Sequence, residues 1–239
     1  MKSSESIISL LGEDSSIQPL NSALRLLILS GIIESKIIES DSLDRDYTLD
    51  KLRQLTNLPL IVRAFILYNS HSKLFGDIIY QFVNIFPTVS EIFIRMTPLP
   101  NNKRLSFFPV LKENNNYVSG GSISSGMLRV FSILLELALA PKGAVILIDE
   151  IENSLGVNCL PQIVDAMLAR CDEVQFIITS HHPYVINNIP YEYWRLVRRQ
   201  GGEVWLQDAK DIPALKNLAS YQDRFLQLIN TPEFEESMG

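Results

Sequence analysis

Two short, mostly apolar runs in the second half of the chain most constrain its fold. The first, residues 144–148, is followed by two acids, and the second, residues 174–179, is followed by a serine and two histidines. A helical pattern precedes each run, over residues 124–139 and 161–170. This alternation is typical of parallel strands that are buried on both faces. The sequence therefore predicts an α/β fold with a parallel sheet.

The remaining elements are predicted from spacing, proline positions and turn residues. Leu20, Leu24, Leu27, Ile28 and Ile32 follow helical spacing, which indicates a helix near residues 19–34. The other expected elements are helices at 60–68, 73–85 and 211–229, strands at 89–96 and 105–111, and a hairpin over 193–207.

Composition limits the classes of function that this chain can have. It has 239 residues, with 21 Lys and Arg against 27 Asp and Glu, so its formal net charge is −6. That balance excludes a basic coat for nucleic acid, although a local basic patch is compatible with it. The hydrophobic share of 46% is enough for a sizeable core. The two cysteines cannot form a disulfide framework, which favours the cytoplasm.

No segment has the pattern of a membrane span or a secretion signal. The most apolar run, residues 23–33, is about half of the ~20 residues that a span needs, and it contains Arg25. A second run, residues 58–68, is interrupted by Arg63, and the polar first residues lack the apolar stretch of a signal peptide. We therefore expect a soluble, cytoplasmic protein that does not associate with membranes.

The two acids after the first run lie where parallel sheets hold their ligands, beyond the carboxyl ends of the strands. There the carboxylate of Asp149 can ligate Mg²⁺ on a nucleotide, directly or through water. Glu150 can polarise a water for attack on a γ-phosphate. The alternative is an ordinary strand that ends at solvated acids.

The Ser- and Gly-rich loop before the long helix also has two interpretations. Ser124 or Ser125 can act as the N-cap of the helix that follows. The same hydroxyls and backbone N–H groups at a helix N-terminus can bind a phosphate.

The histidine pair after the second run is the third candidate. His181 and His182 lack partners at metal-ligand spacing, because the third histidine, His71, lies far upstream. His181 can donate a hydrogen bond to a γ-phosphate, or it can be a simple loop residue.

Taken in order, three segments resemble the C-terminal half of an ABC-type ATPase head. They are ISSGMLR at 123–129, ILIDEIENSL at 146–155 and ITSHHP at 178–183, and residues 86–92 resemble the segment before the signature loop. The resemblance is narrowest to the RecF/SMC-related AAA-type ATPases of OLD-like and anti-phage defence systems. It covers roughly residues 58–200.

The resemblance implies a role for each matching residue. Ser124, Ser125 and Gly126 fall on the signature motif, which in this family reaches across a dimer to the γ-phosphate on the other head. Asp149 falls on the Walker B acid that is linked to Mg²⁺, and Glu150 falls on the catalytic base.

The later motifs carry over in the same way. Asn153, Ser154 and Leu155 fall on the D-loop, which runs along the head–head interface in this family, and His181 falls on the switch histidine that contacts the γ-phosphate. His182 stands where relatives often carry serine, so the resemblance gives it no role.

One departure from the family is large. The chain contains no G-x-x-x-x-G-K-[ST] sequence, and Gly120 and Gly121 do not fit that spacing. We therefore expect the N-terminal P-loop lobe to be missing here, and to lie upstream in a longer parent, on another polypeptide, or nowhere. On this expectation the chain alone binds ATP weakly or not at all.

The expected fold class is thus an α/β, P-loop NTPase-like (ABC ATPase head) C-terminal lobe with a parallel sheet and a helical signature subdomain. Four parts are expected: a helical segment at 1–57, a helical and strand subdomain at 58–116, the ATPase lobe at 117–200, and a hairpin strand with a helix at 201–239.

The implied function is ATP hydrolysis with Mg²⁺ at a dimer interface, powering a DNA-repair or anti-phage defence complex. The implied partners are a second head, as a homodimer or a composite dimer held by ATP, and a nuclease or effector subunit. The alternative is a non-catalytic scaffold without a P-loop of its own. One further cluster is basic and aromatic, and it can either contact DNA or belong to a solvated edge hairpin that is blunted by charge: Tyr191, Tyr193, Trp194, Arg195, Arg198 and Arg199. No TOPRIM-like acidic set follows the core, so no OLD-type nuclease is predicted in this chain.

Overall fold

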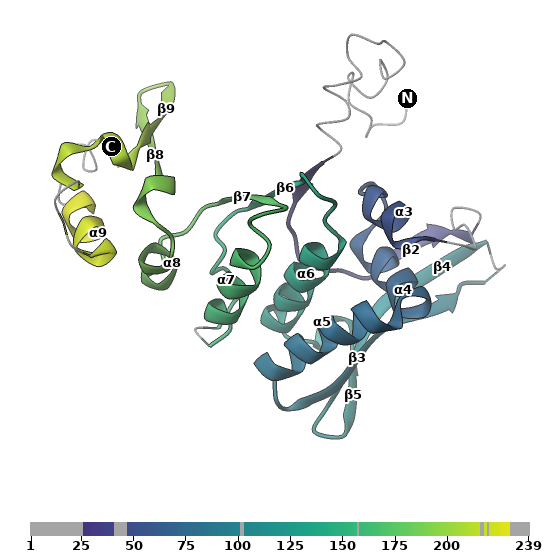
Figure 1. Ribbon diagram of the computed structural model, residues 1–239. Coiled ribbons are helices and arrows are strands. Elements are labelled where there is room, and N and C mark those ends of the chain that lie inside the picture. The colour runs from purple at the N-terminus through teal and green to yellow at the C-terminus, as the bar shows by residue number, and fades with distance from the viewer. Residues whose placement is uncertain are drawn as a thin grey trace, which may run out of the picture. The chain divides into compact units, whose positions relative to one another are not determined.

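The computed structural model describes residues 26–40, 47–100, 103–156, 158–215, 218 and 220–229 (Figure 1). The chain divides into two compact units, one up to Ile178 and one from Thr179 onward. Among the described residues, no helix combines the length and the apolar character that crossing a bilayer requires.

The first unit contains a three-stranded parallel sheet. Its strand order is β1 (Leu27–Leu29), β6 (Val145–Ile148) and β7 (Gln175–Ile178). Helix α7 (Leu160–Leu168) connects β6 to β7 and supplies the crossover that a parallel pair needs. The predicted α/β fold with a parallel sheet is therefore confirmed.

Helices cover one face of this sheet. Figure 1 shows α6 (Ser125–Leu139) and α7 on the same side of β6 and β7. Ile146 and Ile148 are buried, as expected for side chains that face covering helices. Helix α6 is itself buried on nearly all sides from Arg129 to Leu139, which explains why its sequence is apolar almost all round.

The opposite face of the sheet is apolar and exposed. Leu29, Leu147 and Ile177 form one row across the three strands in the observed register. Leu29 is 76% exposed and Ile177 is 52% exposed. Parallel sheets are normally covered on both faces, so this row is unusual for the class.

A second, antiparallel sheet precedes α6 in the sequence. Its central strand is β4 (Arg104–Glu113), which pairs with β3 (Val89–Pro98) on one side. On its other side β4 pairs with β2 (Lys36–Glu39) and then with β5 (Asn116–Ser119). The predicted strands at 89–96 and 105–111 are confirmed, and residues 101–102 between them lie outside the described residues.

Among the described residues between β2 and β3 there are three helices, and the last of them packs against α6 to form the aromatic part of the core. They are α3 (Leu49–Gln54), α4 (Leu60–Ser70) and α5 (Ser72–Ile85), and the last two match the predicted helices at 60–68 and 73–85. The ring of Phe131 on α6 packs edge-on against Phe82 and Phe75 of α5, at centroid distances of 5.7 and 6.3 Å. These contacts join the antiparallel part of the unit to α6.

The helix predicted near residues 19–34 is wrong where the structure describes it. Residues 27–29 form strand β1, paired in parallel with β6, and 36–39 form a second strand. The helical character expected for 1–57 is thus wrong over these strands, while residues 1–25 and 41–46 lie outside the description. A short apolar run is compatible with helix or strand, and here pairing with a distant strand decides between them.

The second unit is small and is built around a hairpin. Its elements are α8 (Pro183–Asn188), β8 (Arg195–Gln200), β9 (Glu203–Asp208) and α9 (Tyr221–Ile229). Ala209, Ile212 and Leu215 form its buried cluster, against which Trp194 packs. The predicted hairpin is confirmed, and the predicted last helix is confirmed over α9 only, because residues 209–211 and 213–215 are short 3₁₀ turns. The four-part division of the chain stays a prediction.

Candidate functional site

The acid pair lies at the carboxyl end of the central strand β6. Asp149 follows buried Ile148 directly, and the side chains of Asp149 and Glu150 are exposed. Glu150 has φ of +43°, a left-handed conformation that non-glycine residues rarely adopt. Ile151 is fully buried and anchors the chain immediately after this turn. The backbone therefore reverses sharply at Glu150 and leaves both carboxylates at the edge of the sheet.

The loop after Glu150 is held by bonds within itself. The Asn153 N–H donates to the Glu150 carbonyl at 2.7 Å, and the Asn153 side-chain amide donates to Glu150 Oε2 at 3.4 Å. Ser154 also has a positive φ, +64°, and its hydroxyl donates to Asn153 Oδ1 at 3.4 Å. Two left-handed residues within five positions mark this segment as strained, which is common where a loop has a functional role.

Helix α6 begins at the serine pair, as one of the two sequence interpretations requires. Ser124 is the N-cap, and its hydroxyl accepts a hydrogen bond from the Met127 N–H at 3.2 Å. The first N–H groups of any helix lack partners inside the helix, so Ser125 and Gly126 lie where backbone donors can receive an anion. The N-cap is therefore observed, and it leaves phosphate binding at the same end as a compatible role.

The structure brings the helix start and the loop after β6 together. A Cβ placed on Gly126 would lie 2.6 Å from the carbonyl oxygen of Ser154, which is closer than real Cβ atoms approach. Only glycine permits this approach without a shift of the backbone. Residues that are 28 positions apart are thus in direct contact, and the predicted signature and D-loop segments form one surface.

The two histidines belong to the second unit and differ in their local roles. His181 is exposed and follows β7 by three residues. His182 is the N-cap of α8, because its Nδ1 accepts a hydrogen bond from the Tyr184 N–H at 3.1 Å. This cap gives a physical reason for the histidine to which the sequence assigned no role.

Three charged side chains are buried together, two of them on α6 and one on α4. Sequence reasoning missed this cluster. Glu136 accepts a hydrogen bond from the Ser30 hydroxyl, and Arg129 donates to the Ser30 carbonyl at 3.4 Å. Arg63 on α4 donates to the Leu139 carbonyl at 3.0 Å. Arg129 and Glu136 are seven residues apart in a largely apolar helix, and that spacing was the available signal, because it places both on one face.

Burial changes the acidity of this cluster. It raises the pKa of Glu136 to about 7, although hydrogen bonds from Ser30 and Gly31 and the charges of Arg129 and Arg63 act to lower that pKa. Burial also lowers the pKa of Arg63 to about 10 and lowers the pKa of Arg129, against the opposing charge of Glu136 in both cases. Glu136 therefore changes its protonation state near neutral pH.

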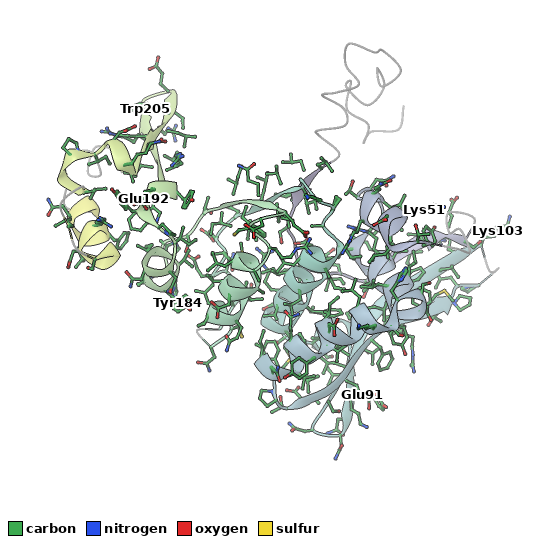
Figure 2. The ribbon with its side chains drawn as sticks, in the orientation of Figure 1. Lys51, Glu91, Lys103, Tyr184, Glu192 and Trp205 are labelled. Carbon is green, nitrogen blue, oxygen red and sulfur yellow. The ribbon has the colours of Figure 1, made fainter. Side chains whose placement is uncertain are left out.

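The basic and aromatic cluster at 191–199 is engaged mainly within its own unit. Arg195 pairs with Asp208 at 2.7 Å, and Arg198 lies 5.6 Å from the centre of the Trp205 ring. Figure 2 labels Trp205 on the hairpin. The guanidinium of Arg224 lies 4.0 Å from the centre of the Tyr191 ring. These contacts favour the interpretation of an edge hairpin blunted by charge over that of a DNA-contacting surface.

The residues at the end of β6 suit a metal that arrives with a nucleotide. Mg²⁺ commonly takes one or two protein carboxylates and fills its remaining positions with phosphate oxygens and water. Asp149, exposed at the carboxyl end of a rigid strand and next to Glu150, fits that requirement. Within the described ranges, no group of three or more His, Cys, Asp or Glu side chains could form a metal site from protein alone.

Comparison with known families gives one match over most of the chain. Residues 20–187 match the family described as "AAA domain, putative AbiEii toxin, Type IV TA system". No curated protein matches.

Two solved structures of SMC ATPases are similar at low identity. One is the SmcHead bound to the C-winged helix domain of ScpA, with 14% identity, a TM-score of 0.45, and coverage of 66% of this chain and 48% of that chain. The other comes from work on ATP-driven dimerization and DNA stimulated activation of SMC ATPases, with 16% identity, a TM-score of 0.41, and coverage of 67% and 94%. The chain thus spans about half the length of the first of these.

Proposed function

Since the chain belongs to this AAA-domain family, we propose that it supplies one half of a composite ATPase site, in which ATP and water give ADP and phosphate. The membership confirms the resemblance to an ABC/AAA-type ATPase domain that the three sequence segments predicted, and it implies nucleotide binding. The observation that carries the proposal is the contact between Gly126 and Ser154, in the loop that follows β6 and begins with Asp149 and Glu150.

The two acids that follow β6, Asp149 and Glu150, have different roles in this proposal. Asp149 would hold Mg²⁺, which would supply positive charge for the phosphates, and Glu150 orients and deprotonates the attacking water. The turn at Glu150 supports this division, because a residue with positive φ directs its side chain differently from the strand residue before it. The hydrogen bond from Asn153 holds the carboxylate of Glu150 at the sheet edge.

The start of α6 and the D-loop act on a nucleotide that a second head holds. Ser124, Ser125 and Gly126 present hydroxyl and backbone donors to its γ-phosphate, and Asn153 and Ser154 line the head–head interface. The close packing of Gly126 on Ser154 supports this assignment, because movement of one segment requires movement of the other. The γ-phosphate contact of His181, which belongs to the second unit, stays a prediction from the sequence.

The phosphate-cradling loop comes from outside these residues in this proposal. No G-x-x-x-x-G-K-[ST] sequence occurs in the chain. The exposed row formed by Leu29, Leu147 and Ile177 supports the proposal, because an apolar face on a parallel sheet needs a cover. We assign that cover to the lobe that carries the P-loop.

The biological setting proposed is a DNA-repair or anti-phage defence complex with a nuclease or effector subunit. The family description, which names a toxin of a type IV toxin–antitoxin system, is compatible with a defence role. A non-catalytic scaffold is the second candidate, and the lack of a P-loop sequence is the observation that favours it.

Nucleotide titration separates the two candidates. Labelled ATP with Mg²⁺ is titrated into the purified chain, alone and together with P-loop proteins encoded next to it. The ATPase proposal predicts weak binding alone, tight binding in the mixture, and loss of the Mg²⁺ dependence in Asp149→Asn. A chain that binds a partner equally well with and without nucleotide is the scaffold.

A further inference from the structure

The buried carboxyl of Glu136 joins two segments that are far apart in sequence. Glu136 lies on α6 and is 7% exposed. It accepts hydrogen bonds from the Ser30 hydroxyl and from the Gly31 backbone, just after β1. Since β1 is parallel to β6, residues 30 and 31 leave the sheet at the same edge as Asp149. The contact therefore runs from the candidate site edge to the helix that begins at the signature residues.

Other bonds between the same segments strengthen this link. The Ile33 N–H donates to Ser132 Oγ at 2.6 Å, and Ser132 donates in turn to the Leu128 carbonyl at 2.6 Å, one turn earlier on α6. Arg129 donates to the Ser30 carbonyl at 3.4 Å. Hydrogen bonds thus join residues 30–33 to α6 at Arg129, Ser132 and Glu136, starting three residues after Gly126.

We propose that Glu136 is a positioning residue, which holds residues 30–33 against α6 and so fixes the signature end of that helix. This contact, called the tie below, opens less often when the Glu136 carboxyl is protonated and more often when it is ionised. The importance of this contact for catalysis rests on the proposed function, whereas the contact itself and its dependence on protonation do not.

The direction of the effect follows from thermodynamic linkage. In the closed state the pKa of Glu136 is about 7, and in water it is 4.5. An opening that hydrates the carboxyl therefore releases a proton, so opening becomes easier as the pH rises through this interval. The facing charged groups are Arg129 on α6 and Arg63 on α4. Burial lowers the pKa of both guanidinium groups, against the opposing charge of Glu136, and the pKa of Arg63, about 10, keeps that side chain protonated over this interval.

Amide hydrogen exchange on the full chain tests the tie without ATP. Protection factors for Gly31, Ile33, Met127 and Leu128, corrected for intrinsic exchange, are measured from about pH 5.5 to about pH 8. The opening constant should rise about 30-fold in the wild type over this range. It should be independent of pH in Glu136→Gln and should follow the wild type in the control Glu91→Gln, which changes an exposed acid of β3.

A second measurement keeps the proposal testable if Glu136→Gln does not fold. The carbon-13 signal of the Glu136 carboxyl should titrate near pH 7 in the wild type. A midpoint in the ordinary glutamate range, or wild-type protection that does not vary with pH, would overturn the tie. Protection that varies at Gly31 and Ile33 but not at Met127 and Leu128 would overturn the positioning role. Failure of ATP hydrolysis leaves all of these results unchanged, so the two proposals fail separately.

Discussion

The carbonyl oxygen of Ser154 lies 2.6 Å from the position that a Cβ on Gly126 would occupy. This contact joins the start of α6 to the strained loop that follows Glu150. In the proposed composite site both segments face the nucleotide of the second head. Contact with that nucleotide therefore depends more on the position of the two segments relative to each other than on the conformation of either.

Gly126→Ala should destabilise the first unit by about 1–3 kcal/mol, because the added methyl group meets backbone that cannot rotate away. Urea denaturation measures the free energy of unfolding. Gly76→Ala on α5 is the matched control, since nothing lies within 4 Å of its Cβ position, and it should stabilise by about 0.5–1 kcal/mol. Equal effects of the two substitutions would contradict the close approach.

Ser124→Ala should cost about 1 kcal/mol, because it removes the acceptor of the Met127 N–H at the start of α6. Ser124→Asn should retain most of the stability, since asparagine is an equally good N-cap. Thermal and urea unfolding of both variants check this. A loss of the same size in both would show that the serine hydroxyl has another structural partner.

The contribution of Glu136 to global stability should fall as the pH rises from about 5 to about 8. The folded pKa of Glu136, about 7, is raised above its value of 4.5 in water, so the unfolded state releases this proton first and gains relative to the folded state. The expected loss is of the order of 2–3 kcal/mol. The urea midpoint should fall with pH over this range in the wild type and should vary less with pH in Glu136→Gln. A pH dependence that the substitution leaves unchanged would show that other groups cause it.

Leu29→Lys and Ile177→Lys should leave the free energy of unfolding within about 0.5 kcal/mol of the wild type, because both side chains are exposed. Each should weaken assembly with a P-loop-bearing partner at least about tenfold, because a lysine would be buried against the covering lobe. Sedimentation of the mixture measures this. Ile37→Lys, a similarly exposed change on β2 of the other sheet, should assemble normally, and assembly unaffected by all three would remove the role of the apolar row.

Sequence patterns were sufficient for elements whose own spacing decides their structure. The apolar runs of β6 and β7 and the helix between them were predicted from local spacing and are observed. A serine N-cap at 124 or 125 was also predicted, and Ser124 is the cap. Strand β1 was not predicted, because helical spacing in residues 20–32 competes with a pairing to a strand 118 residues later. Local patterns do not encode such pairings.

The candidate site, like the fold, could be predicted from the sequence only in part. Asp149 and Glu150 could be placed at a strand end from sequence, but the contact between Gly126 and Ser154 depends on how two loops pack. The tie between Ser30 and Glu136 was hidden for a different reason: an acid in an apolar helix is normally expected on its solvated face. Only the depth of α6 in the unit reveals that this acid is buried.

The most direct test of the central claim is the ATP turnover of Glu150→Gln in the assembly that contains a P-loop partner. Removal of the proposed base should lower turnover at least about 100-fold while ATP-dependent assembly persists, because Mg²⁺ and phosphate contacts do not need Glu150. Turnover equal to that of the wild type in the same assembly would contradict the assignment of a hydrolytic site to the end of β6.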